Sequence, residues 1–267
     1  MENMINFYNL CGSHSTDQTI YFNDLTNDFR GIVEGTYDDH DNKLIVIRDD
    51  VYQFGTKARF AIEVIKQIVK EQNPKVLVLL CDLFDSTQIA VSKACKELNI
   101  KLKIYTQTTS RINNAYSEVA KTYGAKYEYF NSLKEAEIGL ENYMSEGKES
   151  FRVPDGLNHE IYLRGVEEMC DKIYDCFGKF DEVWCTVESG ATLNGIMRSK
   201  IANTYYAVAV KKNLPLTGES KLIYSEVDYE KSCLPYFPPY PSNLFVDSKI
   251  YKHVKDRKGK ILIWNKV

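Results

Sequence analysis

The chain has no close pair of cysteines and few histidines. Its seven cysteines are widely spaced, with no Cys-x-x-Cys pair among them, and its four histidines are scattered over 267 residues. Disulfide frameworks and structural zinc sites depend on paired or clustered cysteines and histidines. The sequence therefore argues against both kinds of site, and we expect reduced thiols in the core and no bound metal.

The chain also has no excess of positive charge. The formal net charge is −3 and the isoelectric point is about 5.9, which gives no general attraction to nucleic-acid phosphates. No apolar run approaches the roughly 18 residues that a membrane helix needs. The segment Met1–Asn6 has no basic stretch leading into an apolar run, as a secretory signal would have. We therefore expect a cytoplasmic protein that binds neither nucleic acid in bulk nor a membrane.

Strand-like and helix-like patterns alternate from residue 43 onward. The predicted strands span 43–48, 76–80, 102–105, 127–130, 183–187, 205–210 and 261–264. The predicted helices span 57–71, 85–98, 117–123, 133–144, 158–177 and 191–200, with a short helix near Ile250. Asp85–Thr87 and Asn158 are predicted to cap the helices that follow them. This alternation predicts an α/β fold with parallel sheets and right-handed crossovers.

Ligands of α/β proteins bind where a strand ends and a helix begins, and one such turn contains a lysine. In Gly55-Thr56-Lys57-Ala58-Arg59 the lysine lies in the first helical turn. The positive end of the helix dipole is unfavourable for an ammonium group there. This favours an amine that acts as a nucleophile or imine former. The alternative is a solvated surface lysine, and the turn alone does not decide between them.

Two further turns follow predicted strands. Cys81–Thr87 has the composition of a loop with an ordinary helix cap. Glu188–Gly195 places small residues and two hydroxyls at a helix N-terminus, directly after an apolar strand, where backbone N–H groups and the helix dipole bind phosphate. A tight turn that needs Gly190 for its backbone is the alternative. Neither the Walker lysine nor the Gly-x-Gly-x-x-Gly pattern of nucleotide-binding proteins is present.

Taken together, these turns resemble the pyridoxal-phosphate enzymes of fold type II, the tryptophan-synthase-β type. The resemblance is to the branch of 1-aminocyclopropane-1-carboxylate deaminase and D-cysteine desulfhydrase. That branch carries a Gly-Asn-Lys-x-Arg segment, similar to Gly55–Arg59, whose lysine forms the internal aldimine. Its phosphate loop, Gly-Ser/Thr-Gly-Gly-Thr-x-x-Gly, is similar to Glu188–Gly195. Weaker matches follow in the family's order at Gly124–Lys126, Pro154–Asn158 and Gly259–Asn265.

The resemblance implies pyridoxal 5'-phosphate as cofactor and a homodimer. It also implies two three-layer α/β domains with parallel sheets, the smaller inserted in the larger. We expect residues 1–54 and 152–267 to form the larger domain and residues 55–151 the smaller. The implied catalytic residue is Lys57, and the implied cofactor-binding residues are Lys57, Asp85, Ser86, Thr87, Ser189, Gly190, Ala191, Thr192 and Asn265. Tyr236 and Tyr240 occupy positions where this branch places tyrosines near the cofactor, although packing is the alternative for both.

One departure from the family concerns the substrate. The family's loop supplies an asparagine to the cofactor and groups for the substrate carboxylate, whereas this chain has Asp85-Ser86-Thr87. A carboxylate at Asp85 would repel an amino acid's carboxylate if it faced the site.

The resemblance implies elimination, deamination or β-replacement on a small amino acid or an amino-acid derivative, with Lys57 carrying the cofactor and moving the proton. Two alternatives stay open. The altered loop admits a larger substrate, such as an amino-acid-modified nucleotide. Alternatively, the chain binds a phosphate-bearing ligand or a protein partner without catalysis.

Overall fold

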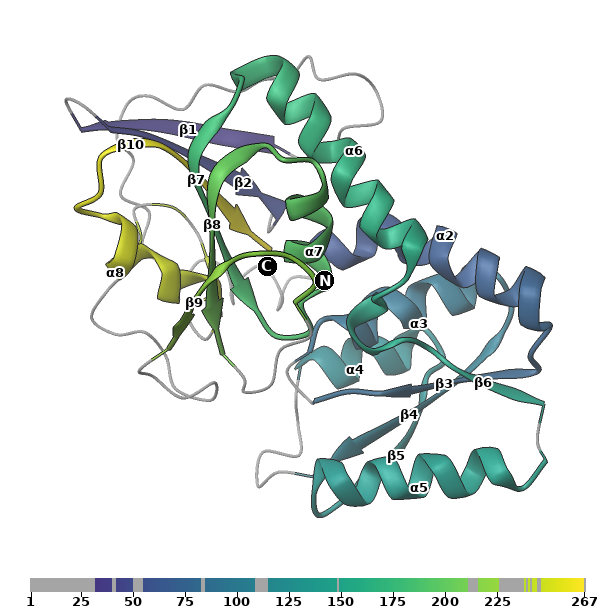
Figure 1. Cartoon of the computed structure of the whole chain (residues 1–267). Coiled ribbons are helices and arrows are strands. Elements are labelled where there is room, and N and C mark those ends of the chain that lie inside the picture. Colours follow the sequence, from purple (N-terminus) through teal and green to yellow (C-terminus); the bar gives the residue numbers. More distant parts are fainter. Residues whose placement is uncertain are drawn as a thin grey trace. The chain divides into compact units, whose positions relative to one another are not determined.

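The chain forms two compact units, each built around one sheet. The computed structural model describes residues 32–39, 42–49, 55–82, 85–108, 115–147, 149–210, 216–225, 238, 240, 242–243 and 246–266. The larger unit comprises Met1–Thr56 and Val166–Val267, and the smaller unit comprises Lys57–Gly165 (Figure 1).

The larger unit contains a six-stranded sheet in the order β1-β2-β10-β7-β8-β9. Its strands are β1 (Ile32–Asp39), β2 (Asn42–Arg48), β7 (Phe180–Val187), β8 (Ala202–Ala209), β9 (Lys221–Tyr224) and β10 (Gly259–Asn265). β1 pairs with β2 in the antiparallel sense, and all other pairs are parallel. The last strand, β10, lies between β2 and β7, so the C-terminal segment completes the middle of the sheet.

Helices cover both faces of the larger sheet. α6 (Glu160–Phe177), from Val166 onward, and α7 (Ala191–Arg198) lie on one face, while η3 (Asp247–Ile250) and α8 (Tyr251–Val254) lie on the other (Figure 1). Alternate side chains of the strands point to each face, and Val46, Trp184 and Ile263 pack with Ile250 and Val254. Burial on both faces explains the nearly continuous apolar runs of these strands.

The smaller unit contains a four-stranded parallel sheet in the order β5-β4-β3-β6. Its strands are β3 (Val76–Leu80), β4 (Lys101–Gln107), β5 (Lys126–Phe130) and β6 (Ser150–Arg152). Its helices are α2 (Gly55–Gln72, from Lys57 onward), α3 (Thr87–Glu97), α4 (Ala115–Thr122) and α5 (Leu133–Ser145), with the short η2 (Asp155–Leu157). α5 packs on one face against Val78 and Tyr105, while α3 and α4 lie on the other face (Figure 1).

The predicted α/β class with parallel sheets is confirmed by these two units. The expected domain limits at 54/55 and 151/152 stay a prediction. Three strands, β1, β6 and β9, were not predicted. β6 has only three residues and directly follows a polar segment, and β9 has four residues of which three are exposed, so neither shows a distinct hydrophobic pattern.

Two predicted helix caps differ in detail. Asn158 does not cap α6; the Nδ1 atom of His159 accepts a hydrogen bond from the backbone N–H of Ile161 at 3.2 Å. At the start of α3, Ser86 makes no side-chain cap, and the Asp85 carboxylate accepts from the Thr87 N–H instead. Residue types that favour N-caps predicted where both helices start, but which residue caps each helix depends on the local backbone geometry.

The described cysteines are free thiols. Cys81, Cys95, Cys170 and Cys185 are buried, as predicted for core thiols, and Cys176 is exposed. Within the described ranges, no group of three or more His, Cys, Asp or Glu side chains is placed to hold a metal ion. The helices of that part of the chain are too short or too polar to cross a bilayer.

Candidate functional site

Lys57 lies in the first turn of α2 and is withdrawn from solvent. The helix starts at Gly55, whose φ of 75° is one that glycine adopts without strain. Only 12% of the Lys57 side chain is exposed, and its Nζ lies 2.8 Å from Oδ1 of Asp85. The Nζ also donates a hydrogen bond to Oγ1 of Thr87. Lys57 is thus held by two residues of the β3–α3 turn and is not a solvated surface lysine.

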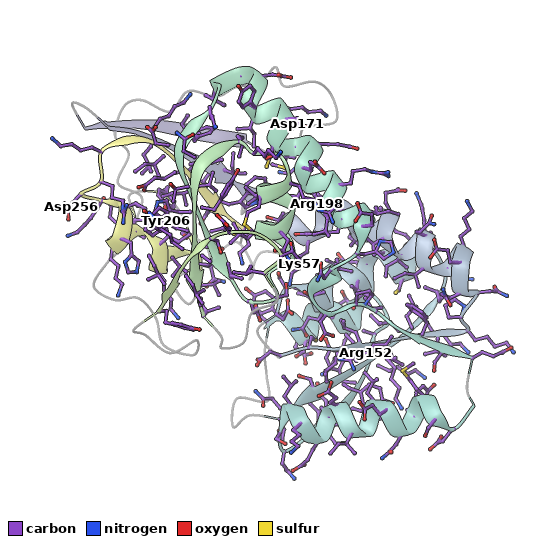
Figure 2. All side chains as sticks on the ribbon, viewed as in Figure 1. Lys57, Arg152, Asp171, Arg198, Tyr206 and Asp256 are labelled. Atoms are coloured by element: carbon purple, nitrogen blue, oxygen red, sulfur yellow. The ribbon has the colours of Figure 1, made fainter. Side chains whose placement is uncertain are left out.

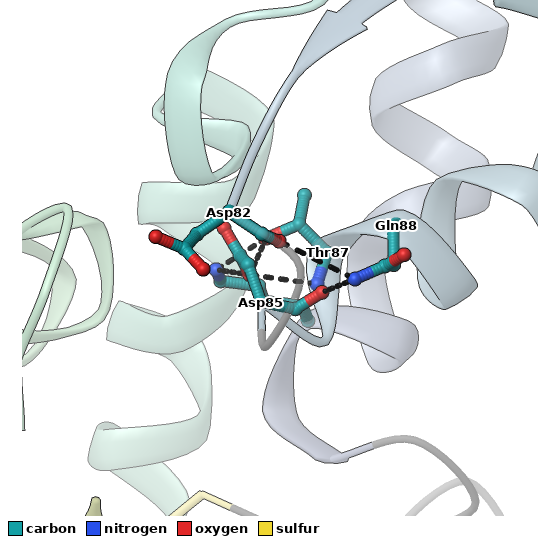
Figure 3. Close-up of polar contacts among 5 residues, drawn as sticks. Asp82, Asp85, Thr87 and Gln88 are labelled. Atoms are coloured by element: carbon teal, nitrogen blue, oxygen red, sulfur yellow. Dashed lines mark hydrogen bonds and ion pairs between the residues drawn. The ribbon is translucent and has the colours of Figure 1, made fainter. Parts of the chain in front are cut away.

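Asp85 lies at the N-terminus of α3, with 11% of its side chain exposed. Its Oδ1 accepts from the backbone N–H of Thr87 at 2.8 Å and from the Thr87 hydroxyl (Figure 3). Ammonium, backbone N–H and hydroxyl all donate to one oxygen, a charge-assisted arrangement. The unfavourable position of an ammonium at the start of α2 is therefore offset by the Asp85 carboxylate.

Gln88 fixes the conformation of this turn, a role that the sequence analysis did not find. It is fully buried, and its Nε2 donates to the backbone carbonyls of Asp85 at 2.9 Å and Asp82 at 3.4 Å (Figure 3). Its Oε1 accepts from the Tyr127 hydroxyl at 2.7 Å. Burial raises the pKa of the Tyr127 hydroxyl, which keeps it a neutral donor. A glutamine directly before the apolar residues Ile89–Val91 of the predicted helix was the only sequence signal for this role.

In the larger unit, the turn between β7 and α7 contains the predicted phosphate loop. Gly190 is the N-cap of α7 with φ 84°, a left-handed conformation that favours glycine. Ala191 and Thr192 are buried in the first turn of the helix, and Ser189 is half-buried. The first N–H groups of a helix have no partner within the helix. The turn thus combines the features that bind an anion: small residues, a left-handed glycine and a helix N-terminus.

The remaining predicted residues lie in different surroundings. Asn265, at the end of β10, is fully buried, and its Oδ1 accepts from the Ser242 hydroxyl at 2.6 Å. Tyr240 is 3% exposed and packs in the core of the larger unit, with its ring in edge contact with Tyr251. This is the packing role considered for it. Tyr236 lies outside the described residues.

A second buried network involves the residue before Lys57. The Thr56 hydroxyl donates to Asp49, and Nε1 of Trp264 lies 3.2 Å from Oδ2 of Asp49 and 3.1 Å from Oγ1 of Thr56. All three side chains are at most 1% exposed. The Thr56 N–H also donates to the carbonyl of Lys266. The start of α2 is thus fixed to the ends of β2 and β10, which no local pattern in the sequence indicated.

The structure therefore brings Lys57, Asp85 and Thr87 together in the smaller unit, with Ser86 as the N-cap of α3. Ser189 to Thr192 form a separate turn in the larger unit, which also contains Asn265. Lys57 is among the residues labelled in Figure 2, which shows its side chain at the start of α2. The first group offers a primary amine with a hydroxyl and a carboxylate, and the second offers an anion-binding turn.

Comparison with known proteins gives one kind of match. No protein-family model and no curated protein matches the chain. Among solved structures, it is similar to an ACC deaminase homologue, with a TM-score of 0.67, 16% identity and 84% of each chain covered. A hydrogen sulfide-producing enzyme from Fusobacterium nucleatum is similar with a TM-score of 0.66, 16% identity, and 87% of this chain and 92% of that chain covered.

A pyridoxal 5'-phosphate-dependent aspartate racemase is also similar, with a TM-score of 0.59, 13% identity and 84% of each chain covered. At identities this low, structural similarity establishes the fold but not the reaction, which has to be inferred from the residues of the chain itself. The resemblance found in the sequence is thereby confirmed for the architecture. The chain has the fold of the pyridoxal-phosphate enzymes of fold type II.

Proposed function

We propose that this chain is a pyridoxal-phosphate-dependent enzyme that acts on the amino group of a small amino acid or an amino-acid derivative. The observation that carries this proposal is the Lys57 amine, which is 12% exposed and held beside Thr87 and Asp85. The expected reactions are elimination, deamination or β-replacement. The homodimer and the cytoplasmic location stay predictions from the sequence.

The residues of the chain fit this cofactor. Pyridoxal 5'-phosphate has an aldehyde, which condenses with a primary amine, and a phosphate group. Lys57 offers a primary amine in a segment similar to the family's lysine segment. The turn from Ser189 to Thr192 begins a helix, and Gly190 has no Cβ to keep an anion away from the backbone. We assign the aldehyde to Lys57 and the phosphate to Ser189–Thr192.

Lys57, Thr87 and Asp85 together can hold and move a proton. When bound, the cofactor supplies an electron sink for the carbon that carries the substrate amine. The Lys57 Nζ donates to the Thr87 hydroxyl, which donates in turn to Asp85 Oδ1. Asp85 Oδ1 also lies 2.8 Å from the Lys57 Nζ, so a proton on the amine has two acceptors within hydrogen-bond distance. The low exposure of Lys57 and Asp85 limits access of water to this proton.

The test is to locate the cofactor on the protein. After incubation with pyridoxal phosphate and reduction with borohydride, mass spectrometry should find the adduct on Lys57. Lys57→Ala and Lys57→Arg should both lose the adduct, since guanidinium stays charged and forms no imine. Turnover should fall by about 10²-fold or more, because the proton-transfer group is lost.

Lys66→Ala is the matched control, because Lys66 lies on the same helix, is exposed and pairs with Glu63. This variant should keep the Lys57 adduct. A wild-type protein without an adduct would favour the alternative of a binding protein that lacks catalysis. An adduct on another lysine would refute the assignment of Lys57.

A further inference from the structure

The Asp85 carboxylate is bound by both the N-terminus of α3 and the Lys57 amine. Oδ1 of Asp85 accepts from Lys57 Nζ at 2.8 Å, from the Thr87 N–H at 2.8 Å and from the Thr87 hydroxyl. An ammonium group and a helix N-terminus together favour a carboxylate. A carboxylate supplied by a ligand would meet the same donors, which Asp85 occupies.

Asp85 is not free to leave this position. Gln88 is fully buried, and its Nε2 donates to the Asp85 carbonyl (Figure 3). The Tyr127 hydroxyl, on β5, donates in turn to Oε1 of Gln88. Thr87 is fully buried as well, so removal of the carboxylate would leave its donors without their acceptor. The carboxylate is thus fixed next to the amine by the fold of the β3–α3 turn.

The charge of Asp85 affects which ligands can bind beside the Lys57 amine. A second carboxylate at hydrogen-bond distance from Asp85 is repelled, and partial burial strengthens that repulsion relative to water. A carboxamide in the same place is uncharged and meets no such repulsion.

We propose that Asp85 is a specificity-determining residue, which selects amines whose neighbouring carbon bears a carboxamide instead of a free carboxylate. This inference rests on the proposed function. The substrate class is then an amino-acid amide or the N-terminal residue of a peptide. Asp85 discriminates by electrostatic repulsion of the ligand that bears a free carboxylate.

The experiment compares L-alaninamide and L-alanine as ligands of the cofactor-loaded protein. Each is titrated while the absorbance of the bound cofactor is recorded, which gives a dissociation constant without turnover. The two amines differ in basicity, so the deciding quantity is the change in their affinity ratio between wild type and variant. Asp85→Asn should shift the ratio toward L-alanine by about tenfold or more, since one repulsive charge is removed.

Asp85→Ser is the second variant, because a serine oxygen still accepts from a helix N-terminal N–H and preserves the fold of the turn. It should shift the ratio in the same direction. Asp155→Asn is the control. It removes one negative charge from the same unit at a side chain that is 64% exposed, and the ratio should stay at the wild-type value.

Two failures are distinguishable. Absence of a borohydride-trapped adduct on Lys57 in the wild type would overturn the proposed function and this inference with it. An adduct on Lys57, together with an affinity ratio that neither Asp85 variant changes, would overturn only the role of Asp85.

Discussion

At the scale of single residues, two glycines of the larger unit allow the anion-binding turn to be tested. Gly190 and Gly178 both have a left-handed backbone, with φ of 84° and 68°. An alanine in either position should cost about 1–2 kcal/mol of unfolding free energy, because its Cβ disfavours this conformation. Gly190→Ala should in addition lower the affinity for pyridoxal phosphate by about tenfold, because the Cβ hinders the approach of the phosphate to the backbone.

Gly178→Ala is the matched control, since its new Cβ would meet only the Lys260 Nζ, at an ordinary 3.8 Å. Urea unfolding measures the stability of each variant, and absorbance titration measures its affinity for the cofactor. Equal affinities in the two variants would remove the turn after β7 from the site.

At the scale of elements, α2 and α6 approach closely within the smaller unit. The rings of Phe60 and Tyr162 meet edge to face at 5.6 Å between centroids. A Cβ at Gly165 would lie 2.5 Å from the Phe60 ring. Glycine to alanine in a helix normally stabilises by about 1 kcal/mol. Here we expect Gly165→Ala to destabilise by about 1–3 kcal/mol, because the ring has to move.

The double variant separates the contact from helix propensity. Phe60→Leu removes the ring, so Gly165→Ala in that background should cost less than it does alone, and the difference is the coupling energy. Urea denaturation of the four proteins measures it. Additive effects would show that the Phe60 ring does not restrict position 165.

At the scale of the whole molecule, the two tryptophans give a probe for one unit. Trp184 and Trp264 are the only tryptophans, and both are fully buried in the larger unit. Trp184 stacks on Tyr206, which Figure 2 labels, at 4.0 Å between ring centroids. The fluorescence of these rings therefore reports on the larger unit, whereas far-ultraviolet circular dichroism also reports on α3, α4 and α5.

We expect the two units to unfold as separate domains, because each has its own sheet and its own apolar cluster. Urea transitions followed by fluorescence and by circular dichroism should then differ in midpoint, which a two-state protein does not show. Coincident transitions by both probes would mean that the two units unfold as one cooperative domain.

The sequence by itself determined the elements and the places where chemistry is possible. The apolar run Val76–Leu80 and the helical spacing after Lys57 specify a strand and a helix through neighbours only a few residues apart. The turns that contain Lys57 and Gly190 follow from this alternation, because parallel strands end where helices begin. Short strands such as β6 and β9 were missed because so few residues show no clear period.

Only the tertiary structure decided which distant residues meet. Lys57 and Asp85 are 28 residues apart, Gln88 and Tyr127 are 39 apart, and Thr56 and Trp264 are 208 apart. These contacts depend on the order of strands in each sheet and on the packing of helices against them, and local periodicity contains neither. The sequence thus placed a lysine at a helix start, because the hydrophobic pattern that specifies a helix involves residues only a few positions apart. The fold placed a carboxylate beside that lysine, because an ion pair depends on distance in space and not on distance along the chain.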